Sequence, residues 1–165
     1  CNYYSGEPVT GLEEGRPMFL RRPDAHFGLA NFMRSHLYAS LATLKIGLDI
    51  LLKEEDVKID SVTGHGGLFK TKGVGQSILA AAMNAPISVM ETAGEGGAWG
   101  MALLAAYMLS KKDGQSLGDY LDSQVFAGRK SETMEPDLAD VAGFEMYTKQ
   151  YQACLAAEKA AVQAF

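Results

Sequence analysis

The chain has 165 residues, of which 47% are hydrophobic and 21% are charged, a length and composition that suit one folded domain and exclude a disordered chain. Its formal net charge of -5 argues against general nucleic-acid binding, and no apolar run approaches the roughly 18 residues that a membrane span needs. Two cysteines, Cys1 and Cys154, are too few for a disulfide framework or a four-ligand zinc site. A reducing, cytoplasmic setting is therefore the expectation.

The N-terminal segment suggests how the chain is organised. It begins at Cys1 without a methionine, and we therefore expect the chain to be a fragment or one domain of a longer protein. We expect a single domain over residues 1–165, with a loop and short strand in residues 1–23 and the core in residues 24–165. Glycines and prolines punctuate the first segment, and residues 17–20 are its strand candidate.

The first regular elements follow from hydrophobic spacing. Apolar residues recur at helical intervals over residues 27–54 without a proline, so we predict a long helix there, capped by Asp24. His36 lies on the apolar stripe of that helix and is predicted to be a core residue. The β-branched run at residues 57–63 predicts a strand, and the alanine-rich run at residues 74–83 predicts a helix.

The second half of the chain repeats the order of strand, glycine turn and helix. A strand is predicted at residues 87–91, a glycine-rich turn at 94–97 and a helix at 98–109. Strands that alternate with helices imply parallel strands and an α/β domain. The remaining predicted elements are a short capped helix at 116–121, an exposed loop at 128–136 and a terminal helix at 137–165.

The first glycine turn, Gly64-His65-Gly66-Gly67, is the most informative feature of the sequence. Glycines there would expose backbone N–H groups and let a ligand approach closely, and a following helix N-terminus favours an anion. A phosphate-bearing ligand is one interpretation of this pattern. The other is that the turn merely connects a strand to a helix, and the turn alone does not decide between them.

Other motifs, present or absent, narrow the range of ligands and reactions that the sequence allows. A Walker A loop is absent, because valine follows Lys72-Gly73. Gly64 and Gly66 fit a dinucleotide fingerprint, and Glu91 ends the next strand, but Phe69 replaces the third glycine. A nicotinamide (NAD)-binding domain of an oxidoreductase is therefore an alternative. The scattered histidines and cysteines predict no metal site, and the elbow motif of serine hydrolases is missing.

The second glycine turn has a structural interpretation that we favour over ligand contact. Gly96 and Gly100 lie one helical turn apart and would form a smooth stripe with Ala102, Ala105 and Ala106. We therefore expect this helix to pack tightly against the sheet.

In this order the segments resemble the FGGY family of carbohydrate kinases. The turn at Thr63-Gly64-His65-Gly66-Gly67 and the helix containing Ile78-Leu79-Ala80-Ala81 are similar to the family's nucleotide-binding segment, and residues 95–106 resemble its second glycine-rich helix. The long helix before the first strand and the terminal helix with Tyr147 and Tyr151 also match. Among members, the chain is most similar to the xylulose and ribulose kinases.

The resemblance implies an α/β fold of the ribonuclease-H-like, actin-like ATPase type: a C-terminal lobe with a mixed sheet of parallel strands flanked by helices. It also implies that ATP and Mg²⁺ bind between two lobes while a sugar hydroxyl attacks the γ-phosphate. The nucleotide-binding candidates are Gly64, His65, Gly66, Gly67, Lys70 and Thr71. Leu68, where the family often has alanine, and a longer segment up to Gly75 are departures from the family pattern.

The resemblance also predicts which functional groups this chain would lack. The family places the general base and the sugar pocket upstream, so we predict no catalytic residue here and no sugar phosphorylation by this chain alone. The expected partners are ATP and a sugar bound mainly by the other lobe. A homo-oligomer is compatible with the apolar helix and aromatic N-terminal segment. A non-catalytic regulatory domain stays open beside the NAD-binding alternative.

Overall fold

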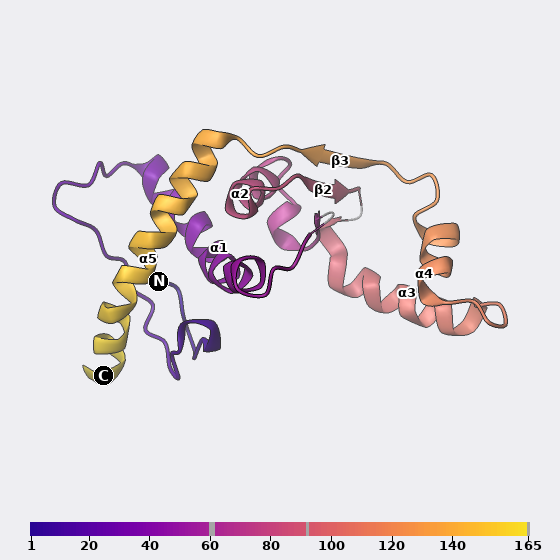
Figure 1. Ribbon diagram of the computed structural model, residues 1–165, viewed down its shortest axis with the longest axis horizontal. Coiled ribbons are helices and arrows are strands. Elements are labelled where there is room, and N and C mark those ends of the chain that lie inside the picture. Colours follow the sequence, from indigo (N-terminus) through magenta and orange to yellow (C-terminus); the bar gives the residue numbers. More distant parts are fainter. Residues whose placement is uncertain (60–61, 92, 165) are drawn as a thin grey trace. The chain divides into compact units, whose positions relative to one another are not determined.

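The computed structural model describes residues 1–59, 62–91 and 93–164, and Figure 1 labels the main elements. The chain divides into two compact units, which we describe separately. The first unit consists of Cys1–Asp60, Ile78–Asn84 and Pro136–Phe165, and the second of Ser61–Ser77 and Ala85–Glu135. That the whole chain forms a single domain stays a prediction.

Two long helices dominate the first unit, α1 (Leu29–Lys53) and α5 (Leu138–Ala164) (Figure 1). They pack through aromatic side chains: the rings of Tyr38 and Phe144 have centroids 4.7 Å apart, and Phe144 is fully buried. Burial of such large apolar groups is the main favourable contribution to folding. The N-terminal segment joins this core through a cluster formed by Tyr3, Leu12, Ala39, Ala42 and Tyr151.

An ion-pair network around the buried Lys45 also links α1 to α5. The Lys45 ammonium lies 2.6 Å from an Asp49 carboxylate oxygen and 2.9 Å from a Glu145 carboxylate oxygen. Burial alone would lower the pKa of Lys45, but its hydrogen bonds to the two carboxylates outweigh burial, and the net shift is upward. The charged form of this buried lysine is therefore stabilised by its partners.

The second unit contains a mixed sheet in the order β1-β2-β3. β1 (Val62–Gly64) runs parallel to β2 (Ile87–Met90), with Thr63 opposite Ser88. β3 (Ser131–Met134) runs antiparallel to β2 on its other side, with Glu132 opposite Val89. The parallel pair confirms the predicted α/β pattern of strand, helix and strand.

Helix α2 (Val74–Met83) contains a polar link to this sheet. The side-chain amide of Gln76, which is 4% exposed, donates to the backbone carbonyls of Ile87 (2.7 Å) and Glu132 (2.8 Å). One buried side chain thus connects β2, β3 and the helix. The helix ends at Met83, and the next residue, Asn84, has a φ of 49°, which is typical of a residue that terminates a helix. The second unit takes only the start of α2, up to Ser77, and also contains α3 (Gly96–Ser110) and α4 (Leu117–Tyr120).

The predicted helices are largely confirmed, and so is the cap of the short helix predicted at 116–121, whereas a cap at Asp137 was not predicted. The Ser116 hydroxyl accepts a hydrogen bond from the Asp119 amide (3.1 Å) at the start of α4. The Asp137 carboxylate accepts from the Ala139 amide (2.8 Å) at the start of α5. Both are the standard way to satisfy the free N–H groups of a first helical turn.

Three predictions in the N-terminal region were wrong. Residues 17–20 form no strand, although Met18 exchanges two backbone hydrogen bonds with Cys1. Asp24 does not cap α1: it pairs with Arg22 at 2.6 Å, and Gly28 precedes the helix without a side-chain cap. His36 is exposed and lies against the ring of Phe32, with centroids 4.6 Å apart, because the stripe it occupies borders an open aromatic surface.

The predicted strands and the glycine stripe also need correction. Residues 57–59 form no strand, while residues 60 and 61 lie outside the described part of the chain. The predicted loop at 128–136 contains β3, because pairing with β2 stabilises a run with little apolar character. In α3 no described side chain is buried, and a Cβ added at Gly100 would contact nothing within 4 Å. Gly96 closely approaches the His65 side chain of the glycine turn, whereas Gly100 is open, so the stripe of small residues does not form the predicted tight contact with the sheet.

Candidate functional site

The glycine turn after β1 has a backbone that requires glycine. Gly66 has a φ of 108°, a conformation that residues with a side chain rarely adopt. Its N–H donates to the carbonyl of Ala93 at 2.6 Å, so this turn is joined to the turn that follows β2. The expectation that the turn presents unbonded backbone N–H groups was therefore wrong at Gly66, because the neighbouring turn already accepts from it.

One end of the turn is covered and the other is open. The ring of Phe69 occupies the place where a side chain on Gly64 would begin, so glycine is needed there for close packing. A Cβ added at Gly66 or Gly67 would contact nothing within 4 Å. Phe69, which replaces the third glycine of a dinucleotide fingerprint, thus packs over the turn itself. A ligand would have access to the turn at Gly66 and Gly67.

The second residue of the turn, His65, packs against α3. Its ring stacks on Trp99, with centroids 5.9 Å apart and an interplanar angle of 10°. A Cβ added at Gly96 would lie 2.8 Å from the His65 Cβ, so glycine lets the first turn of α3 approach the glycine turn. The Arg129 guanidinium lies 5.5 Å from the centre of the Trp99 ring. A ligand contact by His65 stays a prediction.

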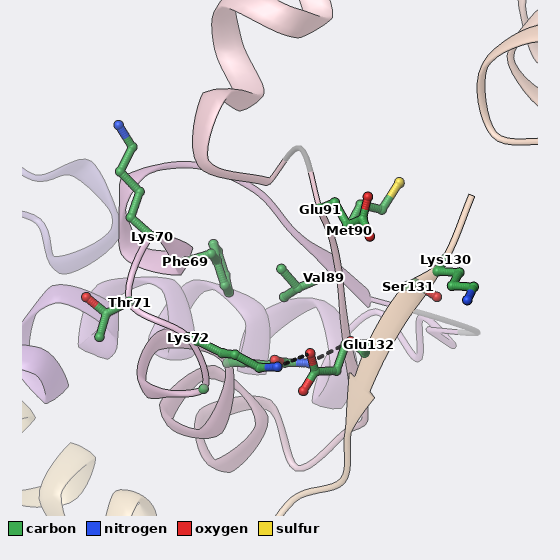
Figure 2. A pocket seen from close by; sticks show the side chains of 12 residues that line it. Phe69, Lys70, Thr71, Lys72, Val89, Met90, Glu91, Lys130, Ser131 and Glu132 are labelled. Carbon is green, nitrogen blue, oxygen red and sulfur yellow. Dashed lines mark hydrogen bonds and ion pairs between the residues drawn. The ribbon is translucent and has the colours of Figure 1, made fainter.

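A cavity of about 490 Å³ is lined by residues 69–73, which follow the turn, together with the end of β2 and the start of β3 (Figure 2). A second hollow of about 390 Å³ shares Phe69 and Lys70 with it and reaches Gly94. Among the six predicted site residues, Lys70 and Thr71 line the larger cavity, whereas the four residues of the glycine turn do not. The predicted site therefore consists of a turn and a neighbouring cavity.

The cavity lining carries charges of both signs. Its lysines are Lys70, Lys72 and Lys130, and its carboxylates are Glu91 and Glu132. The Lys72 ammonium lies 3.0 Å from a Glu132 carboxylate oxygen. Figure 2 shows these two side chains directed toward each other, while Lys70 and Lys130 point away from the pair. Glu132 and Lys130 were not predicted as site residues, because the sequence pattern at 128–136 predicts an exposed loop, whereas Glu132 belongs to β3 and Lys130 directly precedes it.

The described residues do not form a preformed Mg²⁺ site. In the described ranges, no three histidine, cysteine, aspartate or glutamate side chains gather where they could hold a metal ion. Mg²⁺ commonly binds through substrate phosphates and water with only one or two carboxylates from a protein. The described residues thus do not form a metal cage of their own.

The described part of the chain contains no helix with both the length and the apolar character to cross a bilayer.

Comparison with known proteins gives the family. Residues 1–109 match the model of the FGGY family of carbohydrate kinases, C-terminal domain. Searches of curated proteins and of solved structures gave no match. The family match agrees with the mixed α/β sheet and identifies the ribonuclease-H-like, actin-like ATPase fold. Kinases of this family are phosphotransferases that generally use ATP and Mg²⁺. The chain belongs to the FGGY family of carbohydrate kinases and represents its C-terminal domain.

Proposed function

We propose that this chain is the nucleotide-binding lobe of an ATP-dependent carbohydrate kinase, with the nucleotide against the glycine turn and the cavity beside it. The observation that carries the proposal is the open space at Gly66 and Gly67, followed along the chain by Lys70 and Thr71 in the cavity lining. The turn lies at the carboxyl end of β1, where ligands of α/β sheets usually bind. A cavity of about 490 Å³ is within the usual size range of small-molecule sites.

Local charge supports a phosphate-bearing ligand. The cavity lining has one more lysine than glutamate, although the whole chain has a formal net charge of -5. A local excess of positive charge in a hollow attracts polyphosphates from solution. A Cβ added at Gly94 would lie 3.3 Å from the Cγ of Lys70, which places the stem of this lysine beside the second turn. We assign Lys70 to the phosphates and Thr71 to the adenosine end.

Titration calorimetry with Mg²⁺-ATP tests this assignment directly. Gly67→Ala places a methyl group in the open space over the turn, and we expect it to weaken ATP binding by about tenfold, roughly 1.4 kcal/mol. Gly143→Ala, in α5, is the matched control, because a Cβ there also contacts nothing within 4 Å. Equal ATP affinity of the Gly67→Ala variant and the original chain would contradict the proposed site.

The same titration separates the competing interpretations. Heat released with NAD but not with ATP would favour the dinucleotide-binding alternative, for which Glu91 at the end of β2 is the expected ribose contact. Binding of neither ligand would favour a non-catalytic regulatory domain. The family match favours ATP over both outcomes.

The acceptor sugar is proposed from the resemblance to the xylulose and ribulose kinases, which suggests a pentulose or a related carbohydrate. Because the family's general base and sugar pocket belong to the other lobe, we expect no transfer of radiolabelled phosphate to any sugar by these 165 residues alone. Turnover by this chain alone would refute that expectation. A panel of sugars assayed with the complete enzyme would identify the acceptor.

A further inference from the structure

We propose that Glu132 competes with an anionic ligand for Lys72. The ion pair would then set how strongly the affinity of the cavity for a ligand depends on the charge of that ligand. The inference rests on the proposed function, because it assigns a selective role to two residues that line the same cavity. It adds residues that neither the glycine turn nor the predicted contacts at Lys70 and Thr71 include.

The pair joins two walls of the cavity. Lys72 belongs to the segment that follows the glycine turn, and Glu132 belongs to β3. The ammonium nitrogen and the carboxylate oxygen are 3.0 Å apart, and Figure 2 shows the contact running from one wall to the other. A phosphate that enters this space meets a lysine whose charge is already balanced by a carboxylate.

The two partners are anchored unequally. The Glu132 backbone pairs with Val89 in the sheet, and its carbonyl also accepts from the buried Gln76 amide at 2.8 Å. Lys72 lies in the connection before α2, next to Gly73, whose φ is 78°, and its side chain is 82% exposed. Lys72 is therefore the partner that can turn toward a ligand, while the Glu132 backbone is held in place.

The exposure of the pair makes the exchange feasible. The Glu132 side chain is 59% exposed, and ion pairs in contact with water are weak. A polyphosphate carries more negative charge than one carboxylate, so it can displace Glu132 from Lys72. Glu132 would then oppose ligands with few charges more effectively than ligands with many. The Glu132 carboxylate thus competes with the ligand for the Lys72 ammonium.

The test compares ATP with adenosine on four forms of the chain: unmodified, Glu132→Gln, Lys72→Met and the double variant. We expect Glu132→Gln to tighten ATP binding by about two- to fivefold, the range that weak surface ion pairs give, and to leave adenosine binding unchanged. The gain should disappear when Lys72 is methionine. Glu135→Gln, which removes the same charge from an exposed residue outside the cavity lining, should change ATP binding little.

Three results would overturn the inference while leaving the proposed function intact: ATP binding that Glu132→Gln does not tighten, equal tightening of adenosine, or a gain that persists without Lys72. Absence of ATP binding by every form would overturn the proposed function and this inference together. Thermal unfolding of each variant checks that it is folded. Lys72→Met gives an independent test, because it should weaken ATP binding more than adenosine binding.

Discussion

The two units of this chain are stabilised in different ways. In the first, α1 and α5 enclose large aromatic side chains, and Phe144 is completely buried. In the second, the strands have only three or four residues each, and no described side chain of α3 is buried. Apolar burial thus dominates the first unit, whereas specific polar and glycine contacts position the elements of the second.

The difference matters for function because the candidate site lies entirely in the second unit. Its turn is fixed by the Gly66 hydrogen bond to Ala93, and its sheet by the Gln76 amide. Segments with few buried apolar contacts open at low free-energy cost and are common at binding sites. We therefore expect the first unit to act as a scaffold and the second to respond to ligand, and four substitutions test this contrast.

The largest expected effect is at Phe144. Phe144→Ala removes a fully buried ring and should lower the free energy of unfolding by about 4 kcal/mol. Urea denaturation followed by circular dichroism measures the change. Met146→Ala, on the same helix but 61% exposed, should change it by less than about 1 kcal/mol. Similar losses for both variants would mean that the aromatic core does not stabilise the first unit.

In the second unit, Gln76→Leu should have the next largest effect. It keeps the side-chain volume but leaves the carbonyls of Ile87 and Glu132 without this donor, for a loss of about 2 kcal/mol. Hydrogen exchange should show faster opening of β2 and β3 than of α1. Gln150→Leu, at an exposed position of α5, is the control. Unchanged exchange in the sheet would show that this polar link is dispensable.

The ion-pair network of the first unit should contribute less. Lys45→Met should lower the free energy of unfolding by about 1–2 kcal/mol, because the carboxylates left behind stay partly exposed and Asp49 keeps its contact with Lys53 at 3.0 Å. Exposed Lys149→Met is the matched control.

The pH dependence of that loss gives a second check. The pKa of Lys45 is raised on folding, so its stabilisation is fully present below the ordinary lysine pKa of 10.5 and is lost as the pH rises through the raised value. Burial raises the pKa of Asp49, but hydrogen bonds from Lys45 and Lys53 outweigh it, and the net shift is downward. Its contribution is lost as the pH falls through that lowered pKa. A Lys45→Met effect that is constant across both limits would contradict this account.

The smallest expected effect is a gain. Gly143→Ala places a methyl group in open space within α5 and should raise the free energy of unfolding by about 0.5–1 kcal/mol, because glycine is a poor helix former. It should leave ATP affinity unchanged, which is why it serves as the control for Gly67→Ala. A change in ATP affinity would contradict the assignment of the two units to scaffold and ligand response.

Local sequence signals predicted the parts of this fold that local physics determines. The helical spacing of residues 27–54, the capped short helix after Ser116 and the glycine turn after β1 all depend on neighbours in the chain, and all are present. The parallel pairing of β1 and β2 followed from their connection through a helix. These features required no knowledge of distant contacts.

Features that depend on distant partners could not be predicted in this way. β3 has little β-strand pattern of its own and exists through pairing with β2, so Glu132 and Lys130 were not recognised as cavity residues. The Gly66 amide is satisfied by Ala93, a residue 27 positions away in the chain (93 minus 66), which a local reading of the turn does not reveal. His36 has helical apolar neighbours but lies at an exposed edge.

Trp99, the single tryptophan of the chain, lies beside the glycine turn, stacked on His65. Tryptophan fluorescence, excited at the red edge of the protein absorption spectrum, therefore comes from the second unit alone. Tyrosines lie in both units, since Tyr107 and Tyr120 belong to the second, so tyrosine signals do not separate the two units. The chain thus carries one intrinsic fluorescent label, and it reports on the unit that contains the candidate site.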